Sequence, residues 1–505
     1  MSAAASRALA PLLSVAAPPL HGLARRVLLA YFARLTRGSL SITEHGQPDV
    51  RLGADAPQEG DAHAVLRVRH ARFWTRMLLG ADLGFAEAYM TGDVECDELG
   101  EVFRLFIHNR EALGNLEVGL LANASAWLQA QLNRRYANTR AGSLSNIGAH
   151  YDISNQMYEA FLSADMTYSC GVYPTLDADV GAARHASAKL AQLTNGAPRK
   201  PQGSGEFADD GPGGPTPPDA EARSDDGKAA KDELEAAQLT KLRLHIERAD
   251  IRKGHHVLEI GTGWGSFAME AVRRTGCTVE SLTLSVEQKA LAEARIAKAG
   301  MSGSIKVHLL DYRDMPASWN DSFDRVVSIE MLEAVGIEFL PTYFENVSRV
   351  LKAQGGAACF QCITMPESRF EAYAAGVDFI KKWIFPGGVL PSVTALIDAA
   401  TRGSKGTLQL DAALSIGPHY ARTLREWRQR FDAAFDEHVR PALLSDHKAI
   451  RELPAEAQAR EVEVFRKKWT YYFVYCEVGF TERVIGDHIL SFTREGNTSL
   501  PTCCG

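Results

Sequence analysis

The segment that most constrains this chain is Val257-Leu-Glu-Ile-Gly-Thr-Gly-Trp-Gly-Ser-Phe267, in which a short apolar run ends in glycines at alternate positions. A run of this length followed by glycines and a helical pattern predicts a strand, a tight turn and a helix. Glycines let the backbone approach a bound molecule, and the start of a helix offers unpaired N–H groups. Because Ser266 precedes Phe267, the spacing is G-x-G-x-G and differs from the dinucleotide pattern G-x-G-x-x-G.

The C-terminal half alternates between strand and helix patterns. Strands are predicted at 256–260, 277–283, 305–310, 324–329 and 356–363, with helical stretches between them. Such alternation predicts an α/β fold with a doubly wound, Rossmann-like sheet that binds ligands at the carboxyl ends of its strands. Residues 365–450 are predicted to be mostly helical and inserted. A last helix at Trp469–Gly479 and closing strands that include Val484–Phe492 complete the predicted domain.

Composition along the chain divides it into several parts. A smaller mixed α+β N-terminal domain is expected at 21–137, and the catalytic domain is expected at 233–492. Flexible tails are expected at 1–20 and 493–505, and linker helices at 138–195 are expected to begin the catalytic domain. Residues 196–232 are expected to be an insertion rich in Pro, Gly and Asp, which is too polar to build a core.

Residues 23–35 form a basic amphipathic pattern with Arg25, Arg26 and Arg34 between apolar positions. Helices of this kind lie on anionic membrane surfaces or pack against their own domain, and both alternatives stay open. We expect this domain to dock on lipid or to form a homodimer.

Bulk properties exclude several classes of protein. The net charge of −7 argues against nucleic-acid binding, and no window is apolar enough for a membrane span. The eight scattered cysteines do not form a disulfide framework, so a reducing, cytoplasmic location is expected, while residues 1–20 leave organellar targeting open. Cys359 and Cys362 lie three apart in a predicted strand and should face opposite sides, so no metal site is expected there. The role of Cys503 and Cys504 stays open.

Polar residues follow the next predicted strands. Thr283 and Gln288 lie after the second strand, where they are candidates to bind ribose hydroxyls, although a capping box from Ser285 to Gln288 explains the same pattern. Tyr312 and Arg313 follow the third strand and are placed to flank an adenine edge or simply to form a loop.

Several segments, in this order along the chain, resemble the cyclopropane-fatty-acyl-phospholipid synthase family, and Glu-x-Gly-x-Gly-x-Gly resembles motif I of S-adenosylmethionine (SAM) methyltransferases. These segments are His150-Tyr-Asp152, Tyr168-Ser-Cys170, Leu258–Gly265, Thr283–Gln288, Ser328–Gly336, Ile384–Pro391, His419–Trp427 and Tyr471–Phe480. The resemblance implies transfer of a methylene from SAM to the cis double bond of a phospholipid acyl chain, by an enzyme in peripheral contact with a membrane.

The candidate site residues fall into two groups. Glu259 is proposed from its place at the end of a strand and Gly265 from the glycine loop, and the other candidates match functional positions of the family. The cofactor-binding candidates are Tyr168, Ser169, Glu259, Gly261, Gly263, Gly265, Thr283, Gln288, Tyr312 and Arg313. The resemblance implies a bicarbonate pocket made by Cys170, Glu333, Gln361, Ile363 and Tyr420, and Cys476 matches a cysteine sometimes treated as the active-site residue. Bacterial relatives often carry histidine at the position of Gln361, and an amide donates a hydrogen bond but does not titrate.

The implied chemistry explains these residue types. An alkene is a poor nucleophile, so a sulfonium must supply the methyl group, and the resulting carbocation needs aromatic faces, for which Tyr168, Tyr420, Phe385 and Trp469 are candidates. A base, expected to be bicarbonate oriented by Glu333, then removes a proton so that the ring closes. For Cys476 we favour packing over nucleophilic catalysis. The alternatives are a methyl-branched product, methylation of an amine, and a lipid-binding scaffold without catalysis.

Overall fold

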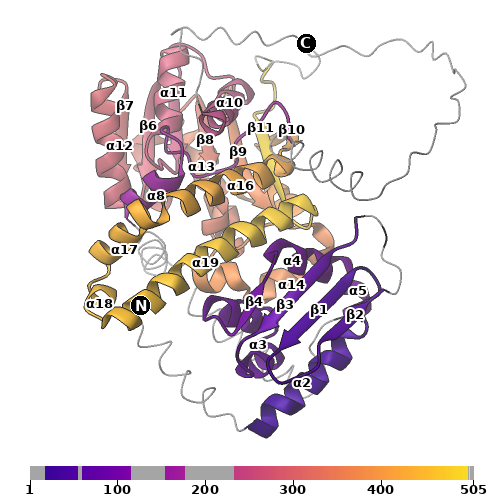
Figure 1. Cartoon of the computed structure of the whole chain (residues 1–505). Helices are drawn as coiled ribbons and strands as arrows, with labels where there is room; N and C mark the ends of the chain where they lie inside the picture. The colour runs from indigo at the N-terminus through magenta and orange to yellow at the C-terminus, as the bar shows by residue number, and fades with distance from the viewer. Residues whose placement is uncertain are drawn as a thin grey trace, which may run out of the picture.

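The computed structural model describes residues 18–54, 58, 60–114, 154–176, 232–498 and 500. The predicted insertion, apart from Asp232, and the His150-Tyr-Asp152 segment lie outside the described residues. Two folded parts lie side by side, an N-terminal part around a four-stranded sheet and a C-terminal part around a seven-stranded sheet (Figure 1). The expected mixed α+β domain followed by an α/β domain is therefore confirmed.

The large sheet has the strand order β10-β11-β9-β8-β5-β6-β7. Its strands are β5 (His256–Ile260), β6 (Thr278–Thr283), β7 (Ile305–Leu309), β8 (Arg325–Ile329), β9 (Ala357–Thr364), β10 (Gln409–Ser415) and β11 (Gly486–Thr493). Strands β5 to β9 pair in parallel, and β11 pairs antiparallel with both neighbours. The strand order reverses between β5 and β8, which is where doubly wound folds bind their ligands.

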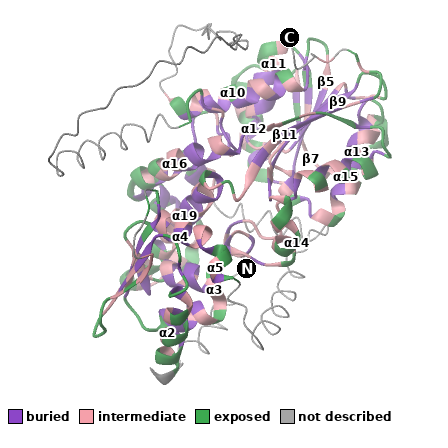
Figure 2. Cartoon of the chain, turned by 90° about the vertical axis from the view of Figure 1, so that its right-hand side faces the viewer, coloured by how far each residue is buried: buried purple, intermediate pink, exposed green. Residues whose placement is uncertain are grey.

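Helices cover both faces of this sheet and create two hydrophobic clusters. On one face pack α10 (Glu233–Arg248), α11 (Ser266–Thr275) and α12 (Val286–Lys298), and on the other pack α13 (Leu340–Val350) and α15 (Val393–Gly403). Figure 2 shows the strands as the most buried part of this domain. Cys359 and Cys362 of β9 belong to different clusters, as the strand pattern predicts.

The prediction for residues 365–450 was wrong in one respect, because it missed β10. Helix α14 (Glu367–Ala375), α15 and α16 (Gly417–Ala434) are present, but Gln409–Ser415 pairs with β11 at the edge of the sheet. Its residues, Gln-Leu-Asp-Ala-Ala-Leu-Ser, carry no β-branched or aromatic side chain. This segment therefore forms a strand because it pairs with β11, although its residues have little intrinsic preference for a strand.

The N-terminal sheet has the order β2-β1-β3-β4, with β1 parallel to β3. Its strands are β1 (Ser39–Glu44), β2 (Val50–Gly53), β3 (His63–Val68) and β4 (Val94–Cys96), and its helices are α2 (Pro18–Phe32), α3 (Arg72–Met90), α4 (Leu99–His108) and α5 (Arg110–Leu113). The predicted amphipathic helix is thus present but begins at Pro18 and ends at Phe32. Ala24, Leu28 and Phe32 are buried against the domain, whereas Leu23 and Val27 are exposed.

Helix α19 (Ala455–Thr481) lies between the two domains (Figure 1) and starts well before the predicted Trp469. The remaining described α-helices are α8 (Asn155–Phe161), α17 (Arg440–Asp446) and α18 (Lys448–Arg451). Helix α19 packs on α16 of the C-terminal domain and on α3 and α4 of the N-terminal domain. Just after α19, Glu482 accepts hydrogen bonds from Arg104 and His108 at 2.9 Å each. Among the described residues, no helix combines the length and the apolarity needed to cross a bilayer.

Candidate active site

A cavity of about 1090 Å³ joins the carboxyl ends of the parallel strands to the N-terminal domain. One end is lined by Gly261, Thr283 and Tyr312, and the other end is lined by Phe85 and Phe103 of the N-terminal domain. This volume slightly exceeds the upper end of the usual range for a small-molecule site, roughly 300 to 1,000 Å³. The cavity therefore has room for a polar ligand at the sheet and an elongated apolar ligand beside it.

The glycine loop has the conformation that its sequence predicts. Gly261, Gly263 and Gly265 have φ values of 107°, 52° and 85°, which side chains with a Cβ rarely adopt. Gly265 is the N-cap of α11, and Gly261 lines the cavity. Gly263 and Gly265 shape the turn without lining the cavity wall.

Glu259 lies in β5, beneath the glycine loop, and does not line the cavity. Its carboxylate accepts a hydrogen bond from Ser281 at 2.5 Å and is only 4% exposed. Burial raises the pKa of Glu259 to about 8, with the hydrogen bond from Ser281 opposing. The structure thus places Glu259 away from the cavity wall that Gly261 helps to form.

Thr283 and Gln288 both line the cavity, and Ser285 caps the start of α12. The hydroxyl of Thr283 donates to Oε1 of Gln288 at 3.0 Å, and the backbone N–H of Gln288 donates to Oγ of Ser285 at 3.1 Å. The backbone N–H of Ser285 donates to Thr283 at 3.1 Å and not to Gln288, so the reciprocal half of the capping box is not formed, and ribose binding by Thr283 and Gln288 stays a prediction.

Tyr312 and Arg313 also line the cavity, after β7. The ring of Tyr312 packs edge-on against Tyr343 with centroids 5.0 Å apart. Nε of Arg313 donates to Asp311 at 2.8 Å, which holds the guanidinium in place.

Tyr168 and Ser169 enter the site from the segment after α8. Tyr168 lines the cavity, and its hydroxyl is 3.0 Å from the hydroxyl of Tyr472. Ser169 does not line the cavity, and its Oγ accepts a hydrogen bond from Nζ of Lys241 at 2.5 Å. Lys241 is fully buried, and burial lowers its pKa while the carboxylate of Glu330 opposes that shift.

The centre of the site is Glu330, which sequence reasoning did not single out. It follows β8 directly and lines the cavity. Its Oε1 accepts from the backbone N–H of Cys170 at 2.9 Å and from Nε2 of Gln361 at 2.7 Å, and its Oε2 accepts from the hydroxyl of Tyr420 at 2.6 Å. The signal available in the sequence was its place at the end of a strand, within Ser328-Ile-Glu-Met-Leu-Glu333.

The backbone at Glu330 has an unusual conformation. Its φ of 48° lies in the left-handed region, which costs a residue with a Cβ about 1–2 kcal/mol. Its N–H donates to the carbonyl oxygen of Gln361 at 2.8 Å, which helps to hold this conformation. Strain of this kind is concentrated at functional sites.

Gln361 links the carboxylate of Glu330, which is partly exposed in the cavity, to a second carboxylate that is buried. Besides Glu330, its Nε2 donates to Oδ2 of Asp487 at 2.8 Å, so both amide hydrogens are used. Asp487 lies in β11 and is completely buried. Burial raises the pKa of Asp487 and of Glu330, with Lys241 opposing both shifts.

Glu333 lies in the 3₁₀ turn Leu332–Ala334 and also lines the cavity. Its Oε1 accepts from the backbone N–H of Ile363 at 2.5 Å, and among the described residues its Oε2 has no hydrogen-bond partner. Burial, followed by the charge of Glu330, raises the pKa of Glu333 to about 8. At neutral pH the carboxyl group of Glu333 is therefore mostly protonated.

These contacts test whether the expected bicarbonate fits. The donors from Cys170, Gln361 and Tyr420 are all bonded to Glu330, and Ile363 is bonded to Glu333. An added anion would find these donors in use and a carboxylate beside it, which is unfavourable in a buried site. The residues present do not fit a bicarbonate ion in the expected pocket.

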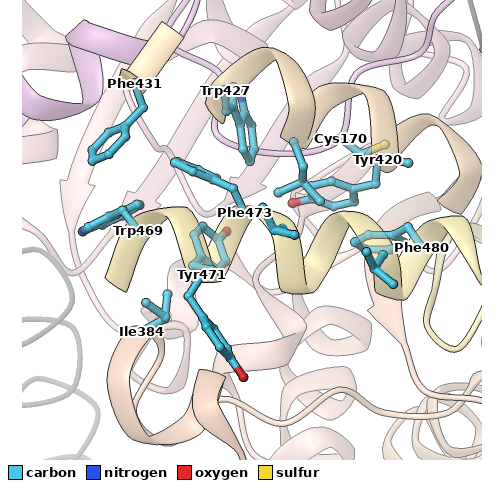
Figure 3. Packing of buried hydrophobic residues seen from close by; sticks show 14 of the residues in the cluster. Cys170, Ile384, Tyr420, Trp427, Phe431, Trp469, Tyr471, Phe473 and Phe480 are labelled. Atoms are coloured by element: carbon cyan, nitrogen blue, oxygen red, sulfur yellow. The ribbon is translucent and has the colours of Figure 1, made fainter. Parts of the chain in front are cut away.

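Three of the four aromatic candidates for cation stabilisation line the cavity, namely Tyr168, Phe385 and Tyr420. Phe480 stacks on Tyr420 with ring centroids 4.4 Å apart and also lines the cavity. The fourth candidate, Trp469, was wrong, because it does not line the cavity and is only 1% exposed. Figure 3 shows Trp469 in the core beside Phe431, away from Tyr420 and Phe480.

Cys476 lines the cavity from helix α19. Burial raises the pKa of its thiol, so the thiol remains protonated at neutral pH. A nucleophilic cysteine needs the thiolate, so this environment favours the packing role.

Comparisons with known proteins agree with this arrangement of elements. The sequence model of the family described as mycolic acid cyclopropane synthetase matches residues 138–196 and 227–488. The chain is 33% identical over 414 residues to a tuberculostearic acid methyltransferase of Mycobacterium tuberculosis, covering 82% of this chain and 79% of that protein. It is 28% identical over 436 residues to the cyclopropane-fatty-acyl-phospholipid synthase of Escherichia coli, covering 86% and 89%.

One solved structure extends the comparison of folds. The crystal structure of coclaurine N-methyltransferase, bound to N-methylheliamine and SAH, aligns with a TM-score of 0.53. The alignment covers 82% of this chain and 100% of that chain at 15% identity, so it supports the fold alone.

Proposed function

The chain belongs to the mycolic acid cyclopropane synthetase family, and from this premise we propose that it converts the cis double bond of an unsaturated phospholipid acyl chain into a cyclopropane ring. The enzyme is a SAM-dependent methyltransferase, and SAM is its methyl donor. The lipid substrate and the ring product are the proposed part.

The observation that carries the proposal is the shared cavity. Gly261 of the cofactor loop and Phe103 of the N-terminal domain line the same continuous space. Between them, Tyr472, Cys476 and Phe480 recur every four residues along one face of α19. A long apolar wall beside a methyl donor suits an acyl chain better than a small amine.

The proposed reaction needs two bond changes at the acyl chain. First, the π electrons of the double bond attack the methyl group of SAM, and the S–CH₃ bond breaks. The sulfur departs as a neutral thioether, and a carbocation forms on the acyl chain. Then a C–H bond of the new methyl group breaks, its electrons form the second C–C bond of the ring, and a base takes the proton. The faces of Tyr168, Phe385 and Tyr420 are available to stabilise the cation.

A methyl-branched product is the second candidate, favoured by the 33% identity to a tuberculostearic acid methyltransferase. The same cation leads to it when a hydride shifts along the chain before the proton is lost. The product is then a methylene branch, which a separate reductase must reduce. Hydrogenation followed by fragmentation of the product distinguishes a ring from a branch.

Contact with a bilayer is the proposed way to reach the substrate. Leu20, Leu23 and Val27 of α2 are 43%, 48% and 44% exposed and lie at helical spacing on one face. Arg26 is exposed beside them, whereas Arg25 is held by Glu44 at 2.9 Å. An exposed apolar stripe with a neighbouring cation suits the interface of a membrane, and a homodimer is the competing use of the same surface.

The experiment incubates the full chain with SAM and vesicles of unsaturated phosphatidylglycerol, followed by mass analysis of the acyl chains. We expect the mass of one methylene group to be added only when SAM is present, and vesicles of saturated lipid provide the control. If calorimetry shows SAM binding but the acyl mass stays unchanged, the proposal is wrong. Absence of SAM binding would instead favour a scaffold without catalysis.

A further inference from the structure

We propose that the side chain of Glu330, rather than a bicarbonate ion, is the base that accepts the proton from the transferred methyl group. The inference rests on the proposed function and adds the identity of the base. In this step the C–H bond of the methyl group breaks, its electron pair closes the ring, and the proton goes to a carboxylate oxygen of Glu330.

The first argument is the set of donors. A carboxylate and a bicarbonate ion are both planar anions with oxygens that accept in-plane hydrogen bonds. Glu330 receives such bonds from three separate elements: the loop at Cys170 at 2.9 Å, strand β9 at Gln361 at 2.7 Å, and helix α16 at Tyr420 at 2.6 Å. The contacts that Cys170, Gln361 and Tyr420 would make to the ion are thus made to a group of the chain itself.

The second argument is position. Glu330 lines the same cavity as Gly261, Tyr168 and Tyr420, so it faces the space that the donor and the acyl chain would share. Met331, the next residue, approaches the glycine loop, since a Cβ built on Gly261 would lie 3.5 Å from its side chain. A carboxylate at this position can reach a proton on the transferred carbon.

The third argument is charge. Lys241 is the fully buried cation whose charge acts on Glu330, and Glu333, with a pKa of about 8, is mostly neutral at pH 7. Glu330 and Asp487 are the two carboxylates that this one cation serves, so a further anion would have no cation left to compensate it. Burial raises the pKa of Glu330, which makes its carboxylate a better proton acceptor than an exposed one. When the product leaves, the proton can pass to water through the open cavity.

The test compares wild type, Glu330→Gln and Glu330→Gly in buffers freed of carbon dioxide, with and without added bicarbonate. Glu330→Gln keeps the shape but not the basicity, so we expect turnover to fall at least about 100-fold with the SAM dissociation constant changed by less than about threefold. Glycine adopts the left-handed φ of 48° without strain. Glu330→Gly therefore leaves a space the size of a carboxylate next to the three hydrogen-bond donors that Glu330 had used. Bicarbonate should therefore restore its turnover at least about tenfold and leave wild type unaffected.

Glu338→Gln is the matched control, because it makes the same chemical change at an exposed position eight residues further along the chain. Two results would overturn the inference: wild type that loses activity without bicarbonate and regains it on addition, or Glu330→Gln with the turnover of wild type. The bicarbonate response of wild type needs no variant, so the inference stays testable even if a variant fails to fold. Wild type that binds SAM but alters no unsaturated lipid would overturn the proposed function, and the inference with it.

Discussion

At the scale of single residues, Gln361 explains why the anion site differs from the one implied by resemblance. A histidine ring nitrogen donates one hydrogen, whereas the amide of Gln361 donates two from the same atom, to Glu330 and to Asp487. The glutamine and Glu330 therefore belong together as one arrangement. The sequence alone pointed to Gln361 as a departure, but the partner that gives the departure its meaning lies on another strand end.

Replacing Gln361 should change the pH dependence of turnover. Gln361→Leu removes a hydrogen bond to the charged form of Glu330, so the pKa of Glu330 should rise further. We expect the acid limb of the kcat–pH profile to move upward by about one pH unit. Gln361→Glu is unsuitable as a control because it adds a charge, so Gln458→Leu on α19 serves instead. An acid limb that does not move would contradict the contact.

Glu259 should make the ligand-free protein less stable as pH rises. Its pKa is about 8 in the folded protein against an ordinary value of 4.5, so protonation stabilises the folded state fully below pH 4.5, and this stabilisation is lost as pH rises through 8. Between these values the free energy of unfolding should fall by about 1 kcal/mol per pH unit from this group. Glu259→Gln should flatten the decline of Tm between pH 6 and 8, and an unchanged slope would show that Glu259 is not protonated.

At the scale of elements, the parallel strands β5 to β9 were predictable and β10 was not. Buried parallel strands carry continuous apolar runs that end in turn residues. The ends of such runs in the sequence indicate where strands such as β5 and β8 begin and end. Strand β10 is largely exposed and is built from residues without strand preference, so only its pairing with β11 identifies it. Helix α2 was predictable as amphipathic, but which of its faces packs inward was not.

The exposed face of α2 should contribute to vesicle binding. The double variant Leu23→Ser and Val27→Ser removes two exposed apolar side chains without touching the buried face. We expect binding to anionic vesicles to weaken about tenfold in co-sedimentation, because burial of each side chain contributes roughly 1–2 kcal/mol of transfer free energy when complete. Leu410→Ser, at an exposed leucine of β10, is the control. Equal binding by all three proteins, with a shift from dimer to monomer in the double variant, would assign the stripe to dimerisation.

At the scale of the whole molecule, the site could be predicted only in part. The cofactor loop and the residues after the strands were recognisable because each lies in a short local pattern, as Gly261, Thr283 and Tyr312 show. The cavity could not be predicted, since its walls come from both domains and from α19. Trp469 and Tyr472 both lie on α19, yet only Tyr472 lines the cavity, because the helix turns Trp469 into the core.

The most direct test of the account uses SAM whose transferable methyl group carries three deuterium atoms, with unsaturated vesicles and mass analysis of the acyl chains. Methyl transfer followed by removal of a proton from that same methyl group predicts a product that retains two of the three deuterium atoms. A product that retains all three, or acyl chains that gain no deuterium while SAM is bound, would contradict the account.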